Sequence, residues 1–226
     1  MPSFETLKLL LKKRVIFSST LLFLIFIGCT CNEYKLTNLD SAKQLVKNYY
    51  ESGQYDEECK RVIDEAISKI DTVNIYPNSA VVFDIDETAL SNYKHTKEIG
   101  FGFIIKIWNQ WLLKADAPAI PQTKRFYDWL LFKNIKIIFL TGRNEEVREP
   151  TLKNLIADGY TKFDTLIVRQ PQEYNIPAAE FKAHKREELV KKGYKIIATI
   201  GDQWSDLVGG NTGIKIKLPN YLYIID

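Results

Sequence analysis

The hydrophobic positions follow two different patterns along the chain. Between residues 39 and 71 the apolar side chains recur every three or four positions, which predicts one or two amphipathic helices. After residue 79 the apolar residues instead form continuous runs, which are typical of strands buried on both faces. These runs predict strands at residues 80–84, 135–141, 165–169, 194–200 and 214–218.

Helical patterns separate most of the predicted strands. One surrounds residues 126–130, a second surrounds 152–156 and stops at Gly159, and a third covers 178–192 before Gly193. Buried strands that alternate with helices favour a parallel sheet with helices on both faces. We therefore expect an α/β fold with a three-layer arrangement.

The N-terminus has the composition of a targeting segment. A basic stretch from Lys8 to Arg14 precedes an apolar stretch, 15–27, which is too short to span a bilayer comfortably. Gly28-Cys29 then resembles a bacterial lipobox, although Phe26 stands where leucine is usual. We expect a signal peptide at 1–28, lipidation of Cys29, a tether at 29–37 and one domain at 38–226. An uncleaved anchor is the alternative. Both the lipidated and the uncleaved form would place the protein in the cell envelope, on the outer membrane or on a membrane that faces the periplasm.

The positive charge of the chain comes from this N-terminal segment. Residues 1–28 carry four basic residues and one acid, so the formal net charge of +3 becomes zero without them. This balance argues against a nucleic-acid polymer as a partner, because such binding needs a basic face on the folded domain. Three cysteines do not form a disulfide framework. Cys59 fits an apolar core position, and a Cys31–Cys59 bridge remains open, as does the oligomeric state.

Polar side chains lie at the carboxyl ends of three predicted strands. Asp84 and Asp86 close the first, Thr141 closes the second, and Asp202 and Asp206 follow the fourth. Because ligands of open α/β sheets bind at the carboxyl edge, we expect these side chains to converge there. Carboxylate oxygens and a phosphate oxygen together suit Mg²⁺. The pattern therefore predicts a magnesium-dependent phosphoryl-transfer site.

The carboxylates can be given separate roles. Asp84 is the predicted nucleophile, which would form an aspartyl-phosphate. Asp86 would lie on the same side of an extended segment, where it can protonate the leaving group and later accept a proton from water. Asp202 would complete the metal site with Asp84. Asp206 would reach the metal through water or orient Lys182.

Other residues are predicted to bind the phosphate. The Thr141 hydroxyl and the Gly142 amide would bind its oxygens, and Lys182 would offset the charge on Asp84 and on the transferred group. Arg143 would contact the phosphate or pair with a carboxylate. Ordinary capping or surface roles remain open for Thr88, Asp206 and Arg143. The chain has no motif of a histidine phosphatase, a cysteine phosphatase or a P-loop protein.

The ordered set of motifs resembles the haloacid dehalogenase superfamily. Within this superfamily, the sequence around the motifs is similar to that of the acid phosphatase branch. This branch includes the bacterial class B and class C acid phosphatases and the plant vegetative storage proteins. The resemblance runs from about Asn38 to the C-terminus and is carried by residues 82–92, Phe181, Lys182, Arg186 and 201–207. It implies a Rossmann-like fold, Mg²⁺ as the cofactor, phosphate monoesters as substrates and metal binding by the Asp86 carbonyl. Arg186 is expected to be structural.

The spans between the motifs are too short for a large cap domain. We expect an open site covered in part by 92–120 and the N-terminal helices. Most aromatic residues between the first and second motifs should pack in the core. One or two of them would stack on an aromatic substrate, such as the base of a nucleoside monophosphate. A role in the site also stays open for His95. These aromatics are Tyr93, Phe101, Phe103, Trp108 and Trp111. A non-catalytic storage or binding lipoprotein and a phosphotransferase are the alternative functions.

Overall fold

The computed structural model describes residues 37–225. Residues Asn38–Asp226 form one compact unit. The predicted signal peptide, Cys29, Cys31 and nearly all of the tether lie outside the described residues. Within the described part of the chain, no helix is long and apolar enough to cross a membrane.

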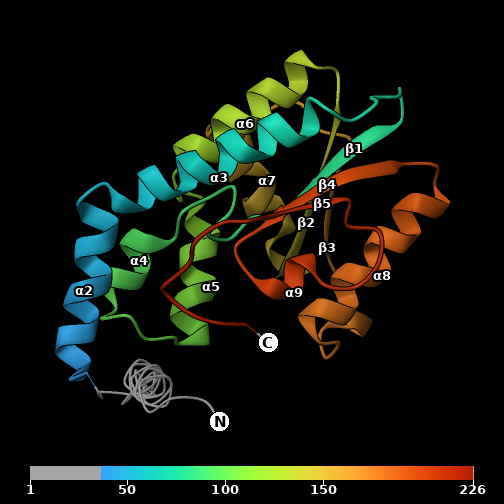
Figure 1. Cartoon of the computed structure of the whole chain (residues 1–226). Coiled ribbons are helices and arrows are strands. Elements are labelled where there is room, and N and C mark those ends of the chain that lie inside the picture. Colours follow the sequence, from blue (N-terminus) through green and yellow to red (C-terminus); the bar gives the residue numbers. More distant parts are fainter. Residues whose placement is uncertain (1–36, 226) are drawn as a thin grey trace, which may run out of the picture. The chain divides into compact units, whose positions relative to one another are not determined.

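A five-stranded parallel sheet forms the centre of the domain (Figure 1). The strand order is β3-β2-β1-β4-β5. The chain moves outward from β1 through β2 to β3, and then returns to the other side of β1 for β4 and β5. The carboxyl edge around β1 and β4 is therefore a topological switch point, where ligands of such sheets bind. The strands are β1 (Ser79–Phe83), β2 (Lys136–Asn144), β3 (Thr165–Arg169), β4 (Lys195–Gly201) and β5 (Ile214–Lys217).

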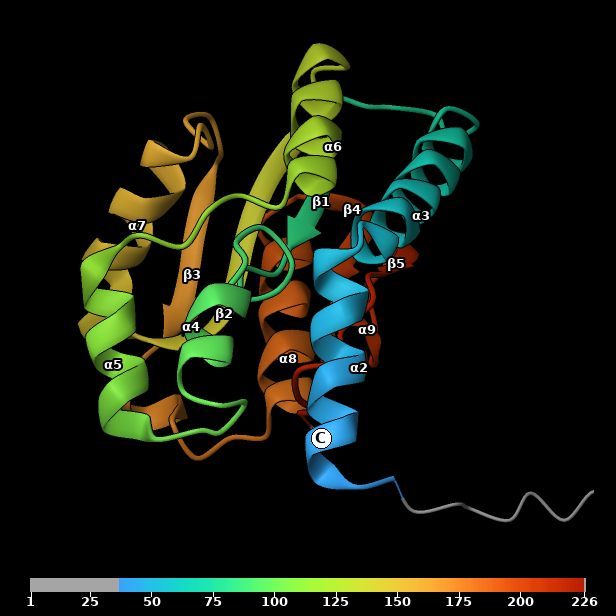
Figure 2. The ribbon, with the colours of Figure 1, turned by 90° about the vertical axis from the view of Figure 1, so that its left-hand side faces the viewer.

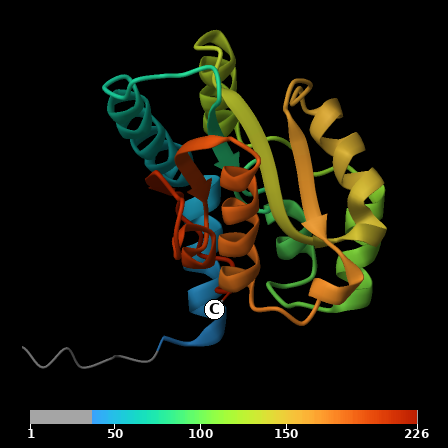
Figure 3. The ribbon, with the colours of Figure 1, turned by 90° about the vertical axis from the view of Figure 1, so that its right-hand side faces the viewer.

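Helices cover both faces of the sheet, and β1 is therefore buried on both sides and mostly apolar. Val81 and Phe83 belong to the larger core cluster, with side chains of α3 and α6, while Ala80 and Val82 belong to a second cluster with α8. Figures 2 and 3 view the sheet from opposite sides, with α6 nearer in the former and α8 nearer in the latter. The expected three-layer α/β fold is confirmed. The helices are α2 (Leu39–Glu51), α3 (Gln54–Ile70), α6 (Pro121–Phe132), α7 (Arg148–Ala157), α8 (Ala178–Lys191) and α9 (Trp204–Leu207).

The connection from β1 to α6 contains two short helices, α4 (Tyr93–Glu98) and α5 (Ile105–Lys114). Within residues 37–225 this connection forms no separate cap domain, as expected from its length. The largest boundary difference from the sequence prediction is in β2, which continues to Asn144 instead of ending at residue 141, while the other strand ends agree within one residue. Its pairing with β3 is interrupted after Leu140 and resumes where Asn144 faces Arg169. The segment with Thr141 is thus an irregular strand end.

Candidate active site

Asp84 and Asp86 leave the central strand in a tight turn. The Asp84 amide donates to the Ile200 carbonyl of β4 at 3.0 Å, so the start of the turn continues the sheet pairing. The amides of Thr88 and Ala89 both donate to the Ile85 carbonyl. Glu87 adopts a left-handed conformation with a φ of 53°. This tight turn directs the two aspartates toward different partners.

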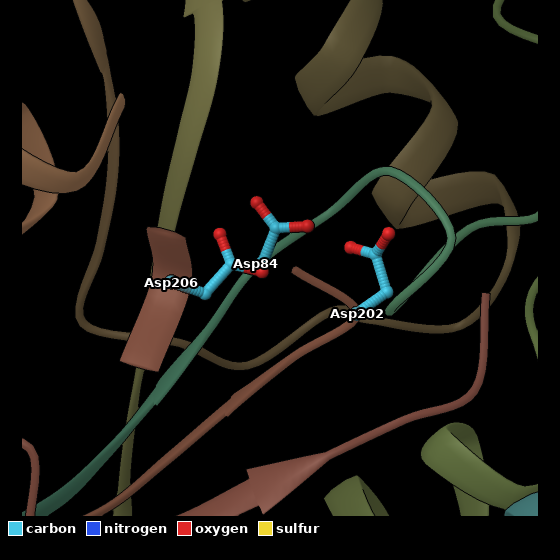
Figure 4. Close-up of side chains that lie close together, drawn as sticks. All are labelled: Asp84, Asp202 and Asp206. Carbon is cyan, nitrogen blue, oxygen red and sulfur yellow. The ribbon is translucent and has the colours of Figure 1, made fainter. Parts of the chain in front are cut away.

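Three buried carboxylates meet at the switch point of the sheet. Figure 4 shows Asp84, Asp202 and Asp206 side by side, and one oxygen of each lies within 4.8 Å of the others. Asp206 folds back over the end of β4, where a Cβ on Gly201 would lie 2.2 Å from its Oδ2, so only glycine fits there. Burial raises the pKa of Asp84 well above its usual range, and burial together with Asp206 raises the pKa of Asp202 to about 7.

This cluster fits a hard divalent cation. Crowded buried carboxylates repel one another, and a cation would offset that repulsion with the oxygen ligands that Mg²⁺ prefers. Among residues 37–225, Asp84, Asp202 and Asp206 are therefore a set of side chains that could bind a metal.

Lys182 is the cation nearest to the carboxylate cluster. It projects from α8, is 5% exposed, and its Nζ donates to Asp84 Oδ1 at 2.5 Å and also to Asp206 Oδ1. Burial disfavours its charged form, but the two carboxylates more than compensate, so the pKa of Lys182 lies above its ordinary value. Of the two roles considered for Asp206 from the sequence, this contact corresponds to the orientation of Lys182. Lys182 thus lies where it can offset charge on Asp84.

Arg143 pairs with Asp86. Its Nη2 donates to Asp86 Oδ1 at 2.6 Å, its Nε donates to Oδ2 at 3.0 Å, and its Nη1 donates to Thr151 Oγ1 at 2.9 Å. Asn92 Nδ2 also donates to Asp86 Oδ1 at 2.8 Å. Burial alone would favour the neutral acid, but Arg143 and Asn92 keep the pKa of Asp86 below its usual range. Of the two roles considered for Arg143, the structure shows pairing with a carboxylate, and its phosphate contact stays a prediction.

Four further residues named from the sequence lie close to this cluster. Thr141 is buried, and its Oγ1 accepts from the Arg143 amide at 3.2 Å, while Gly142 lines the pocket. Thr88 Oγ1 donates to Asp202 Oδ1 at 3.2 Å, so it contacts a candidate metal ligand as well as lying in the turn. Arg186 is fully buried and donates to the carbonyls of Asp206, Val208 and Gly210, which is the structural role expected of it.

The site also uses residues that the sequence analysis missed. Gln203 Nε2 and Asn220 Nδ2 both donate to Asp202 Oδ2 at 2.6 Å. Tyr223 donates to Glu87 Oε2 at 2.5 Å. Gln203 could have been suspected because it follows Asp202 directly. Nothing local marks Asn220 and Tyr223, which come from the segment after β5.

Arg169, at the end of β3, is a further residue without a sequence signal. Its Nη1 donates to the carbonyls of Glu173 at 2.7 Å and Ile176 at 2.6 Å, so it stabilises the loop that leads into α8. The guanidinium also lies 4.5 Å from the centre of the Phe181 ring. Arg169 thereby supports the start of the helix that carries Lys182.

A pocket of about 540 Å³ opens beside the carboxylates. Charged side chains, among them Asp84, Asp86 and Lys182, line it together with several large apolar side chains. Apolar lining combined with placed polar groups is common in small-molecule sites. The apolar lining includes Ile99, Phe101, Phe103, Trp108, Leu222, Ile224 and Ile225.

The five aromatic residues of the first span have different surroundings. Phe101, Phe103 and Trp108 line the pocket. Tyr93 instead stacks on Tyr50 of α2 at 4.6 Å between ring centres, and it donates to Glu51. Trp111 is buried and donates to Asn92 Oδ1 at 2.7 Å. Only part of the cluster can therefore meet a substrate.

The two histidines also differ in their surroundings. His95 lines the pocket and stacks on Trp111 with ring centres 5.0 Å apart. Its Nε2 is buried and finds no hydrogen-bond partner among the described residues. His184 is exposed, and its Nδ1 lies 3.4 Å from Glu188 Oε1.

Comparison with known proteins agrees with this geometry. Residues 31–226 match the family described as HAD superfamily, subfamily IIIB (Acid phosphatase). The stem 28 kDa glycoprotein of Glycine max is 38% identical over 80% of this chain and 74% of its own length. Acid phosphatase 1 of Solanum lycopersicum is 33% identical over 80% and 73%. Vegetative storage protein 1 of Arabidopsis thaliana is 35% identical over 84% and 74%.

A solved structure shows a similar arrangement of the chain. The class C acid phosphatase from Bacillus anthracis, with tungstate bound, aligns with a TM-score of 0.67 and 25% identity. The alignment covers 82% of this chain and 86% of that chain.

Proposed function

Because the chain belongs to the haloacid dehalogenase superfamily, subfamily IIIB, and is a phosphomonoester hydrolase of that acid phosphatase family, we propose that Asp84 carries the phosphoryl group in its reaction. The observation that supports this most directly is the cluster of Asp84, Asp202, Asp206 and Lys182 at the switch point of the sheet. A carboxylate nucleophile beside a fixed ammonium and candidate metal ligands suits attack on an anionic phosphate.

The reaction proceeds in two displacements. An oxygen of Asp84 attacks phosphorus as the bond to the leaving oxygen breaks, and Asp86 in its protonated form gives that oxygen a proton. Water then attacks the aspartyl-phosphate, Asp86 takes a proton from the water, and the carboxylate of Asp84 is released. The contact with Arg143 favours the ionised form of Asp86, which is the form that the second step needs. Lys182 offsets charge on Asp84 and on the transferred group in both steps.

The proposed cofactor is Mg²⁺, held by the side chains of Asp84 and Asp202, by the carbonyl of Asp86, and by Asp206 directly or through water. When bound, the cation neutralises phosphate charge and orients the ester for in-line attack. Thr141 and Gly142 would bind the remaining phosphate oxygens.

Two other functions must be distinguished from hydrolysis of phosphate esters. Vegetative storage proteins are among the relatives, but this chain keeps an aspartate at position 84, which a protein used only for storage does not need. A phosphotransferase would use the same intermediate and pass the phosphoryl group to an alcohol. Measuring free phosphate against phosphorylated glycerol in the presence of glycerol separates the two reactions.

We expect nucleoside monophosphates to be preferred over aliphatic phosphates, since Phe103 and Trp108 line the pocket. Because stacking contributes about 1–3 kcal/mol per base, Phe103→Ala should lower kcat/KM for AMP and UMP about ten-fold and leave glycerol phosphate within about two-fold. Phe103 is 70% exposed, so the fold should tolerate the change. Tyr93→Phe, outside the pocket, is the control. Equal kcat/KM values for AMP and glycerol phosphate in the wild type would contradict stacking.

The proposed location is the cell envelope, with the membrane reached through a lipid anchor on Cys29. Cys29→Ser should leave the full-length precursor, because the lipid and the cleavage both depend on that thiol. Intact-mass measurement of protein extracted from membranes distinguishes the products, and Cys31→Ser is the matched control. A mature wild-type protein with an unmodified Cys29 would refute the proposal.

A further inference from the structure

The segment after β5 forms part of the lining of the active-site pocket. In Figure 1 it is the red trace that leads from β5 to the C-terminus. Asn220 binds Asp202, as described above, and the Ile225 amide donates to Gln203 Oε1 at 3.0 Å. Tyr223 donates its hydroxyl to Glu87, the residue after Asp86. The segment is therefore fixed to the two stretches of chain that carry the catalytic carboxylates.

Residues 222–225, which we name the C-terminal wall, present mainly hydrocarbon to the pocket. Leu222, Ile224 and Ile225 line the same pocket as Asp84 and Lys182. The Tyr223 hydroxyl is bound to Glu87, and the Tyr223 carbonyl accepts from Gln203 at 3.4 Å. The polar groups of the wall are thus largely engaged with the protein. What remains to meet a ligand is apolar.

Two large apolar side chains that line this pocket are also exposed. Ile224 is 84% exposed and Phe103 is 70% exposed, and both line the pocket. Large apolar side chains gathered around a pocket mark a ligand site more often than isolated ones do. Because these apolar side chains line the same pocket as the carboxylate cluster, they would meet the part of the substrate that is attached to the phosphate.

We propose that the C-terminal wall binds the leaving group of the phosphate ester and favours leaving groups with an apolar aromatic face over small polyols. The proposal rests on the proposed function, since the phosphate must lie at Asp84 for its leaving group to reach the wall. Tyr223 acts as a positioning residue, because its bond to Glu87 keeps the three aliphatic side chains at the pocket. An apolar leaving group then gains by covering hydrocarbon, whereas a small polyol does not.

Binding to Asp84→Asn tests the wall without turnover. Calorimetry should show that Ile224→Ser in this background raises the Kd of 1-naphthyl phosphate about five-fold and that of glycerol 2-phosphate less than about two-fold, as partial burial of one isoleucine implies. The matched control is Phe132→Ser at the end of α6, which is 81% exposed and does not line the pocket. Thermal unfolding of each variant checks the fold.

A second variant tests the positioning role. Tyr223→Phe removes only the hydroxyl that binds Glu87, and it should raise the Kd of 1-naphthyl phosphate about three-fold while leaving glycerol 2-phosphate nearly unchanged. Equal losses for both ligands would overturn the proposal, since the segment would then act only on the catalytic carboxylates. Unchanged binding of 1-naphthyl phosphate in Ile224→Ser would also overturn it. A wild type that hydrolyses no phosphate ester would contradict the proposed function alone, because these affinities do not depend on turnover.

Discussion

We expect Asp84→Asn to lower kcat by roughly a thousand-fold or more, because the amide keeps the shape of the side chain but removes the nucleophile. Phosphate release from a phosphomonoester in saturating Mg²⁺ measures the effect. The fold should persist, since Asp84 is one of several crowded carboxylates and Lys182 keeps its bond to Asp206. A cooperative unfolding transition near that of the wild type would show this.

The matched control for this change is Asp116→Asn, which alters an exposed aspartate in the loop after α5. It should retain nearly full activity. If Asp84→Asn kept a tenth or more of the wild-type kcat while Asp116→Asn behaved as expected, the aspartyl-phosphate mechanism would be wrong. Trapping of labelled phosphate on the wild-type protein, but not on Asp84→Asn, would identify the intermediate directly.

The second large effect concerns the metal. Chelation should abolish activity and Mg²⁺ should restore it, because the buried carboxylates of Asp84, Asp202 and Asp206 need a cation to offset their repulsion. Mg²⁺ should also stabilise the folded state, by about 2.7 kcal/mol at a concentration one hundred times its Kd. Thermal unfolding with and without the metal measures this independently of activity.

Variants of Asp202 and Asp206 should show that these two aspartates have different roles. Asp202→Ala should remove most of the response to Mg²⁺, whereas Asp206→Ala should weaken it less, because Asp206 also binds Lys182. Glu57→Ala, on the exposed side of α3, is a control for the loss of a carboxylate elsewhere. Full activity in excess chelator would rule out the metal-dependent mechanism, and equal losses in both aspartate variants would contradict the difference assigned to them.

The sequence by itself was enough to predict the layers of the fold and the edge of the sheet at which the candidate catalytic groups lie. Apolar runs predicted the five strands, because a strand buried on both faces, such as β1, is apolar at nearly every position. The carboxyl ends of parallel strands share one edge, so Asp84 and Asp202 were expected at the same edge once the sheet was parallel. The strands follow from local hydrophobic patterns, and the position of the site follows from the rule that ligands bind at the carboxyl edge of a parallel sheet.

The partners of the side chains were decided only by the tertiary structure. Arg143 binds Asp86, and Tyr223 reaches Glu87 from the far end of the chain, because the packing of distant segments selects one partner among many polar groups. Likewise, Trp111 is buried while Phe103 lines the pocket, although both belong to one aromatic run. Hydrophobic periodicity describes which face of an element is buried, but it contains no information about which segment will lie against that face.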